Sequence, residues 1–138
     1  MMNTILVPVW VLAFFATIIK AELTIEEKVK AIAFSRACLA DTGVNPDLIK
    51  AARQGNFSND SKFKDYVFCM SKRIGFQNDA GELQNDAIVK KVGAALGDME
   101  AAKKLAASCV VVKENKQDTA VASFKCYYDN TPNHLSIL

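Results

Sequence analysis

Four cysteines, Cys38, Cys69, Cys109 and Cys126, constrain the fold of this 138-residue chain more than any other feature of its sequence. An even number of cysteines in a short secreted chain indicates a disulfide framework. No two of them have the two-residue spacing of a zinc or redox motif, and one histidine is too few for a mixed Cys/His site. We therefore expect two disulfides, no metal and no cofactor, with three pairings open at this point.

Residues 1–21 are expected to form a secretory signal peptide. The run from Ile5 to Ile19 is apolar and uncharged, but it is shorter than the about 20 residues that cross a membrane. It is followed by Ala21, a small residue of the kind that precedes a signal-peptidase cleavage, although the opening residues MMNT carry no Lys or Arg. We therefore predict a secreted, extracellular protein whose folded domain is residues 22–138.

The charge balance argues against a nucleic-acid partner. The chain has 17 basic and 15 acidic side chains, and no basic stripe remains in residues 22–138. Catalysis is not expected either, because the one histidine, His134, follows a proline in the tail and is not an anchored general base. Two sequons, at Asn56 and Asn59, would allow glycosylation of a secreted protein.

The stretch from Asp60 to Gly75 predicts the central helix of the domain. Asp60 is a favourable N-cap, and Gly75 is able to end the helix in the left-handed conformation. Cys69 lies beside the apolar face, so it could be bridged to a neighbouring helix while that face packs in the core. The apolar residues recur at intervals of three and four, as one helix face requires: Phe63, Tyr66, Val67, Met70 and Ile74.

A capping box from Thr24 to Glu27 predicts the start of an earlier helix that runs to about Thr42. Thr24 would be the cap, and the Glu27 side chain would reach back to it. The apolar residues of this helix are expected to face the core: Ile25, Val29, Ile32 and Leu39.

Four shorter helices complete an all-α fold of six short helices. Pro46 favours the start of one of them, because proline suits the first turn of a helix. Gly93 is expected to stop another, and Asp98 to cap the next, which would carry Val110 inward. The predicted ranges are 45–55, 85–92, 97–113 and 118–129.

The last two predicted helices favour one disulfide pairing. Cys109 and Cys126 lie on helices joined by a polar turn, at similar distances from it. An antiparallel helix hairpin would bring them together, which favours Cys109–Cys126 and leaves Cys38–Cys69. Bridges matter in a domain of this size, since each is worth roughly 3 kcal/mol in the chain-entropy model.

The cysteine spacing resembles that of the insect odorant-binding proteins with two cysteines missing. The four cysteines are separated by 30, 39 and 16 residues. Asp65 and Gln117 stand where that family has its second and fifth cysteines, which it pairs with each other. Losing both removes one bridge and leaves no odd thiol, as in the four-cysteine (Minus-C) subgroup. Local phrases agree: CLADTGV, GNFSND, FCMSKRIGF and FKCYYDN.

The resemblance implies a six-helix fold that encloses an apolar cavity, with the pairings Cys38–Cys69 and Cys109–Cys126. It implies a secreted carrier, not an enzyme, for small hydrophobic ligands such as odorants, pheromones or similar semiochemicals. Other partners would be an olfactory receptor or a membrane surface at release, and the protein would be a monomer or weak dimer. Two alternatives stay open: a lipid or pheromone carrier of haemolymph or reproductive gland, and a disulfide-stapled interaction protein without a pocket.

Ligand-binding residues are expected among the larger inward side chains, although core packing is the alternative role for each of them. Many other inward residues are alanines, which fill little space, and methionine offers adaptable apolar surface. The apolar residues of the tail, after the break at Pro132, are expected to close the pocket. The candidates are Phe34, Val67, Met70, Ile74, Leu105, Phe124, Tyr127, Ile137 and Leu138.

Overall fold

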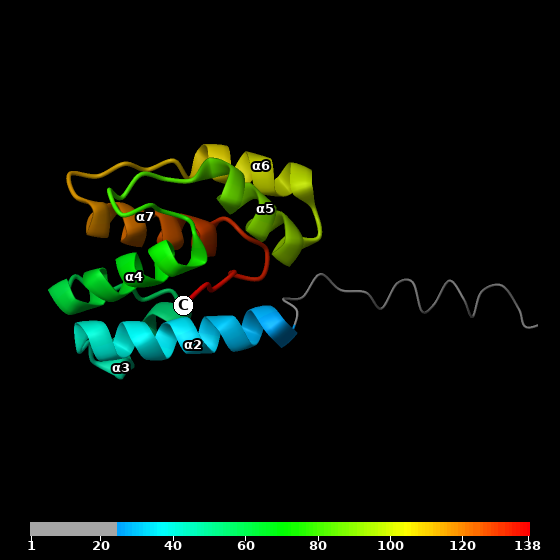
Figure 1. Cartoon of the computed structure of the whole chain (residues 1–138). Helices are drawn as coiled ribbons and strands as arrows, with labels where there is room; N and C mark the ends of the chain where they lie inside the picture. The colour runs from blue at the N-terminus through cyan, green and yellow to red at the C-terminus, as the bar shows by residue number, and fades with distance from the viewer. Residues whose placement is uncertain (1–24) are drawn as a thin grey trace, which may run out of the picture.

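The computed structural model describes residues 25–138 of the chain. This part contains six helices joined by loops (Figure 1). Within this range a single isolated bridge, between Gln77 and Leu83, is the only strand-like pairing. The expected all-α class is therefore confirmed, whereas the expected signal peptide and the Thr24 cap lie outside the described residues. The helices are α2 (Ile25–Thr42), α3 (Pro46–Arg53), α4 (Ser61–Ile74), α5 (Asn85–Leu96), α6 (Met99–Ser108) and α7 (Lys116–Asp129).

Helix α4 lies at the centre of the domain and packs between α2 and α7 (Figure 1). It begins and ends as the sequence predicts: the Phe63 amide donates to Asp60 Oδ1 at 3.0 Å, and Gly75 ends the helix with φ 90°. The residues of the predicted apolar stripe lie on the buried face of α4, although Ile74 is only half-buried. The fully buried members are Phe63, Tyr66, Val67 and Met70.

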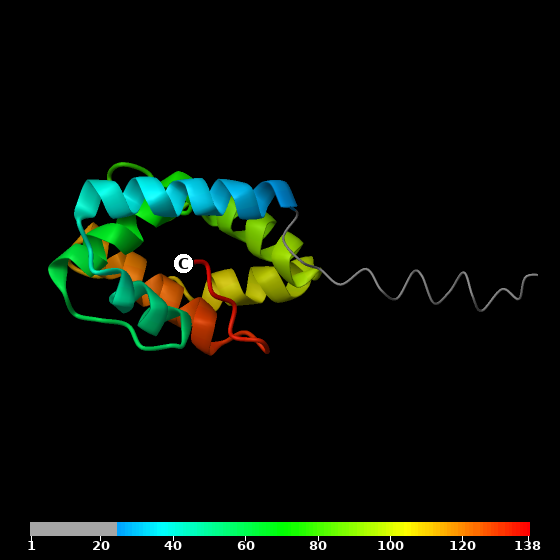
Figure 2. The same cartoon turned by 90° about the horizontal axis from the view of Figure 1, so that it is seen from below.

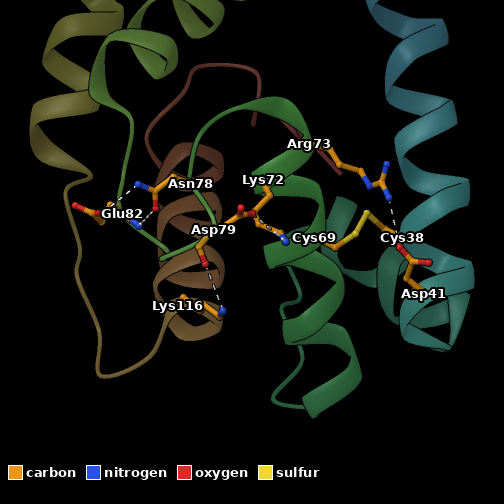
Figure 3. Close-up of polar contacts among 9 residues, drawn as sticks. All are labelled: Cys38, Asp41, Cys69, Lys72, Arg73, Asn78, Asp79, Glu82 and Lys116. Atoms are coloured by element: carbon orange, nitrogen blue, oxygen red, sulfur yellow. Dashed lines mark hydrogen bonds and ion pairs between the residues drawn. A yellow bond between two sulfur atoms is a disulfide. The ribbon is translucent and has the colours of Figure 1, made fainter.

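Two disulfides tie neighbouring helices together, in the pairing that the helix hairpin favours. Cys38–Cys69 joins α2 to α4, and Cys109–Cys126 joins the end of α6 to α7. Beside the first bridge, Arg73 of α4 reaches Asp41 of α2 with 3.4 Å between Nη2 and Oδ2 (Figure 3). The α2–α4 contact is thus covalent at one turn and ionic at the next.

The predicted inward face of helix α2 is only partly correct. Ile25 and Val29 are 82% and 60% exposed, so their expected inward orientation is wrong. Leu39 is half-buried against the core as expected, and Ile32 borders the cavity described below. The Cys38–Cys69 bridge and a hydrogen bond of 2.9 Å between Ser35 Oγ and Tyr66 Oη determine the rotation of the helix. At 100° per residue, Ile25 and Val29 then point away from α4.

Helices α5 and α6 differ from the prediction at their C-terminal ends. Gly93 does not stop α5, which runs to Leu96 with Gly97 as its C-cap; Gly93 is buried and lies against the Met99 side chain, which a Cβ there would displace. α6 ends before Cys109, and Val110, expected inward, is 57% exposed. Three successive valines follow Cys109, and β-branched residues disfavour continuing the helix.

Helix α7 begins two residues before the predicted start. Its N-cap is Asn115, whose Oδ1 accepts from the Asp118 amide at 2.8 Å, so Asp118 lies in the first turn. The same residue forms an ion pair with α4, with 2.9 Å between Lys64 Nζ and Asp118 Oδ1. Lys64 and Asp118 directly adjoin Asp65 and Gln117, where the resemblance described above would place two further cysteines. An ion pair therefore links α4 to α7 beside these two positions.

Replacing Cys38 and Cys69 together with alanine is expected to lower the free energy of unfolding by about 3 to 4 kcal/mol. The bridge closes a loop with a sequence separation of 31, and its removal restores the conformational entropy of that loop in the unfolded chain. Urea unfolding followed by circular dichroism would measure the change. A loss below about 1 kcal/mol would contradict the role given to this bridge.

Replacing Asp118 with asparagine is expected to destabilise the protein at neutral pH but not in acid. The hydrogen bond from Lys64, helped by Asn115, holds the pKa of Asp118 below its ordinary value. A lowered pKa in the folded state stabilises the fold above the unfolded pKa of about 4, and this contribution is lost as the pH falls through the folded pKa. Urea midpoints of the two proteins should therefore converge below about pH 4.

Asp65→Asn is the matched control, because it removes the neighbouring carboxylate of α4, which has no ion pair within the described residues. Its urea midpoint should follow that of the parent protein at every pH. Equal losses in both variants would mean that net charge, and not the Lys64–Asp118 contact, decides the result.

Candidate functional site

An apolar cavity of about 840 Å³ lies between α2, the C-terminal end of α4, α5 and the C-terminal segment, residues 132–138. Figure 2 shows this segment, in red, ending in the space that the helices surround. The volume lies within the range of about 300 to 1,000 Å³ that is usual for small-molecule sites. The apolar wall residues are Ala31, Ile32, Phe34, Met70, Ile74, Phe76, Val92, Ala95, Leu135, Ile137 and Leu138.

One wall of the cavity is the C-terminal end of α4 together with Phe76, two residues beyond the helix. Phe76 contributes to this wall and is backed by two further rings, with centroid distances of 6.1 Å to Phe124 and 6.0 Å to Tyr127 in edge-on geometry. These rings belong to α7 and are almost completely buried. Phe76 therefore separates the packed core from the cavity.

The structure divides the nine candidate residues into two groups. Phe34, Met70, Ile74, Ile137 and Leu138 line the cavity. The other four are buried in the core and do not line it: Val67, Leu105, Phe124 and Tyr127.

The sequence analysis missed several wall residues. Val92 and Ala95 of α5 are three apart and face the cavity from one side of their helix, and Ile32 borders it from α2. The spacing on α5 was visible in the sequence, but the predicted stop at Gly93 cut the helix before Ala95. Leu135 belonged to the apolar tail but was not among the candidates.

The C-terminal segment is held against the helices at several points. Thr131 Oγ1 donates to the Tyr127 carbonyl at 2.9 Å and accepts from the Leu135 amide at 2.7 Å. Further along, Arg53 of α3 donates from Nε to the backbone oxygen of Leu138 at 2.9 Å. His134 stacks on Tyr128 with 4.7 Å between ring centroids. The segment is thus a wall of the cavity with its own hydrogen-bonded anchors.

Few polar groups lie on the core side of the cavity, whereas charged side chains lie at its edge. Burial raises the pKa of Tyr66 and raises the pKa of Tyr127 to about 12, so both hydroxyls stay protonated at neutral pH. Ser35 faces the cavity while bonded to Tyr66. The charged lining residues are Glu27, Lys28, Lys30, Arg36, Arg53 and Lys91.

The apolar walls are suited to holding an apolar molecule. Among residues 25–138, no group of three His, Cys, Asp or Glu side chains is placed to hold a metal ion. In the same range, no helix is both long and apolar enough to span a membrane.

Comparison with known proteins identifies the family. The model of the PBP/GOBP family matches residues 20–130. The B1 protein of Tenebrio molitor is 31% identical over 99 residues, which are 72% of this chain and 76% of that protein.

Solved structures agree with this match. Apis mellifera odorant binding protein 5 superimposes with a TM-score of 0.70 over 81% of this chain and 95% of its own; at 19% identity this likeness concerns the fold alone. The THP12 carrier protein from yellow meal worm is 35% identical, with a TM-score of 0.58 over 70% of this chain and 89% of its own.

The expected kinship with odorant-binding proteins is therefore confirmed, and four cysteines in two disulfides fit a Minus-C-like subgroup. A family model that covers most of the chain, a carrier protein at 35% identity and the shared helical fold lead to one conclusion. This chain belongs to the PBP/GOBP family, a family of binding and carrier proteins.

Proposed function

We propose that the protein is a secreted carrier that binds small hydrophobic molecules in the cavity and transports them through aqueous fluid. The observation that carries the proposal is the cavity itself, about 840 Å³ in volume with eleven apolar wall residues. Odorants, pheromones and similar semiochemicals have the size and polarity that such a space accepts. Burial of a ligand there would gain about 0.8 kcal/mol for each methylene removed from water.

The cavity favours a carrier over a disulfide-stapled protein that acts only through its surface. A protein of the second kind needs no internal space, and filling this one would stabilise the fold, because cavities cost free energy. The same cavity would serve a carrier in antennal fluid, haemolymph or a reproductive gland. The family is one of binding proteins, which supports transport without turnover in each setting.

The proposed ligand contacts are the apolar wall residues on α2, α4, α5 and the C-terminal segment. Phe34 and Met70 offer a ring and a flexible thioether, which adapt to ligands of different shape. Val92 and Ala95 contribute the α5 side, and the small Ala95 leaves room for the ligand. Ile137 and Leu138 line the cavity and are half-buried, so the C-terminal segment is proposed to act as its gate.

Ala95→Trp is expected to weaken binding of the neutral dye phenylnaphthylamine by about tenfold or more. The indole would occupy part of the cavity and compete with the dye for it, and a tenfold loss of affinity corresponds to about 1.4 kcal/mol. Dye fluorescence, and its reversal by a volatile alcohol or ester, would measure binding to both proteins.

Ala94→Trp is the matched control, since Ala94 is the preceding residue of α5 and points to solvent. It should bind the dye as the parent protein does, with the same helical circular dichroism. If the parent protein takes up no dye, the carrier proposal is wrong; if Ala95→Trp and the parent bind equally, the dye lies elsewhere.

Arg53→Gln is expected to speed ligand release by about fivefold without changing the helical circular dichroism. The substitution removes the hydrogen bond to the Leu138 backbone oxygen, and a bond of this kind is worth about 1 kcal/mol. Stopped-flow dilution of the dye complex would give the release rate. Lys50→Gln, on the same helix, removes an equal charge without touching the segment and should change nothing.

A chain shortened by residues 133–138 provides a second variant for the gate. It should release the dye at least as fast as Arg53→Gln. Release at the parent rate from both proteins would show that the C-terminal segment is a wall but not a gate.

A further inference from the structure

The edge of the cavity is strongly cationic in a chain whose charges are nearly balanced. Five of the 17 Lys and Arg residues line the cavity, but only one of the 15 Asp and Glu residues does, Glu27. Charges gathered at the mouth of an apolar space raise the local concentration of oppositely charged ligands. The field at this mouth therefore favours an anion.

Three of these cations are available to a ligand. Lys30 already pairs with Glu26, with 3.0 Å between Nζ and Oε1, and Arg53 is engaged with the C-terminal segment. Within residues 25–138, no ion pair or hydrogen bond occupies the side chains of Lys28, Arg36 and Lys91. These three residues, here called the rim cations, come from two helices, α2 and α5.

The interior of the cavity offers no comparable polar partner. Ser35 and Ser136 are the uncharged polar side chains of the lining, and Ser35 Oγ is already 2.9 Å from Tyr66 Oη. Beyond the rim the walls are apolar, with Phe34 on α2 and Ile74 on α4. A ligand that matches both regions has an apolar chain and a single charged end.

We propose that the cavity takes amphiphiles of the alkyl carboxylate class, with the carboxylate at the rim cations and the alkyl chain in the apolar interior. This inference rests on the proposed carrier function and specifies its ligand. The carboxylate stays in the solvated rim, where Lys and Arg side chains reach it without a buried ion pair. The alkyl chain supplies most of the affinity through burial, and the rim cations supply selectivity over neutral ligands.

The test compares decanoate with decanol, which share a chain length and differ in the charge of the head group. Both are titrated into the protein loaded with the neutral dye phenylnaphthylamine, at neutral pH and low ionic strength. Decanoate is expected to displace the dye at about tenfold lower concentration, because exposed ion pairs with the rim cations each contribute a few-fold. The advantage should largely disappear in about 1 M salt, where the Debye length is about 3 Å.

The triple variant Lys28→Gln, Arg36→Gln, Lys91→Gln should lose the tenfold preference, measured as the ratio of the decanol and decanoate concentrations that displace half of the dye. The matched control is Lys62→Gln, Lys90→Gln, Lys104→Gln, which removes three exposed cations that do not line the cavity. This control should keep the preference for decanoate.

The outcomes separate this proposal from the carrier function. Equal displacement by decanoate and decanol in the parent protein would overturn the anionic ligand and leave the carrier intact. Equal losses in the two triple variants would also overturn it, since net charge and not the rim would then be responsible. Failure of the parent protein to take up the dye would instead contradict the carrier function itself.

Discussion

The Cys38–Cys69 disulfide determines how α2 is rotated against α4, and the cavity depends on that rotation. With Cys38 turned toward α4, Phe34 and Ser35 face inward one turn earlier. The N-terminal half of α2 then extends past α4 without a helix packed beneath it. A space remains between this half, α5 and the end of α4, and the C-terminal segment covers it (Figure 2). The bridge therefore shapes the site without lining it.

The domain divides its apolar residues between a dense core and the cavity wall. Phe76 marks the boundary, with Phe124 and Tyr127 packed behind it. The core side is densely packed, whereas wall atoms around the cavity have fewer protein neighbours and therefore fewer dispersion contacts within the protein. A molecule that binds only the folded state raises the free energy of unfolding, and at saturating concentrations this increase grows with the logarithm of the ligand concentration. Thermal stability and ligand occupancy should accordingly be coupled in this protein.

The sequence predicts those elements whose local signals agree with their packing. Asp60, the apolar stripe and Gly75 all indicate the same helix, and α4 forms as expected. Local signals failed where packing decided the outcome. Gly93 looks like a helix stop but is a contact residue for Met99, and the apolar residues at the start of α2 are not its inward face.

The site was predictable only in part, for a physical reason. Helical periodicity shows which residues leave the solvent, but it does not show whether they meet other side chains or an empty space. Met70 and Val67 lie on the same stripe of α4, yet Met70 lines the cavity and Val67 packs in the core. The difference arises from elements far apart in the sequence, namely α5 and the C-terminal segment. The rim cations were not predicted for the same reason, since residues of α2 and α5 line one cavity only in the folded chain.

The position of Leu138 has a practical consequence for handling the protein. Its backbone oxygen is bonded to Arg53 and its side chain is part of the cavity wall. An affinity tag or surface anchor attached behind it would leave directly from that wall, and immobilised protein would then report on an altered pocket. The loop between α6 and α7, residues 109–115, contains no residue of the wall and carries exposed side chains such as Val112. Labels and sensor attachments placed there would leave the binding space as it is.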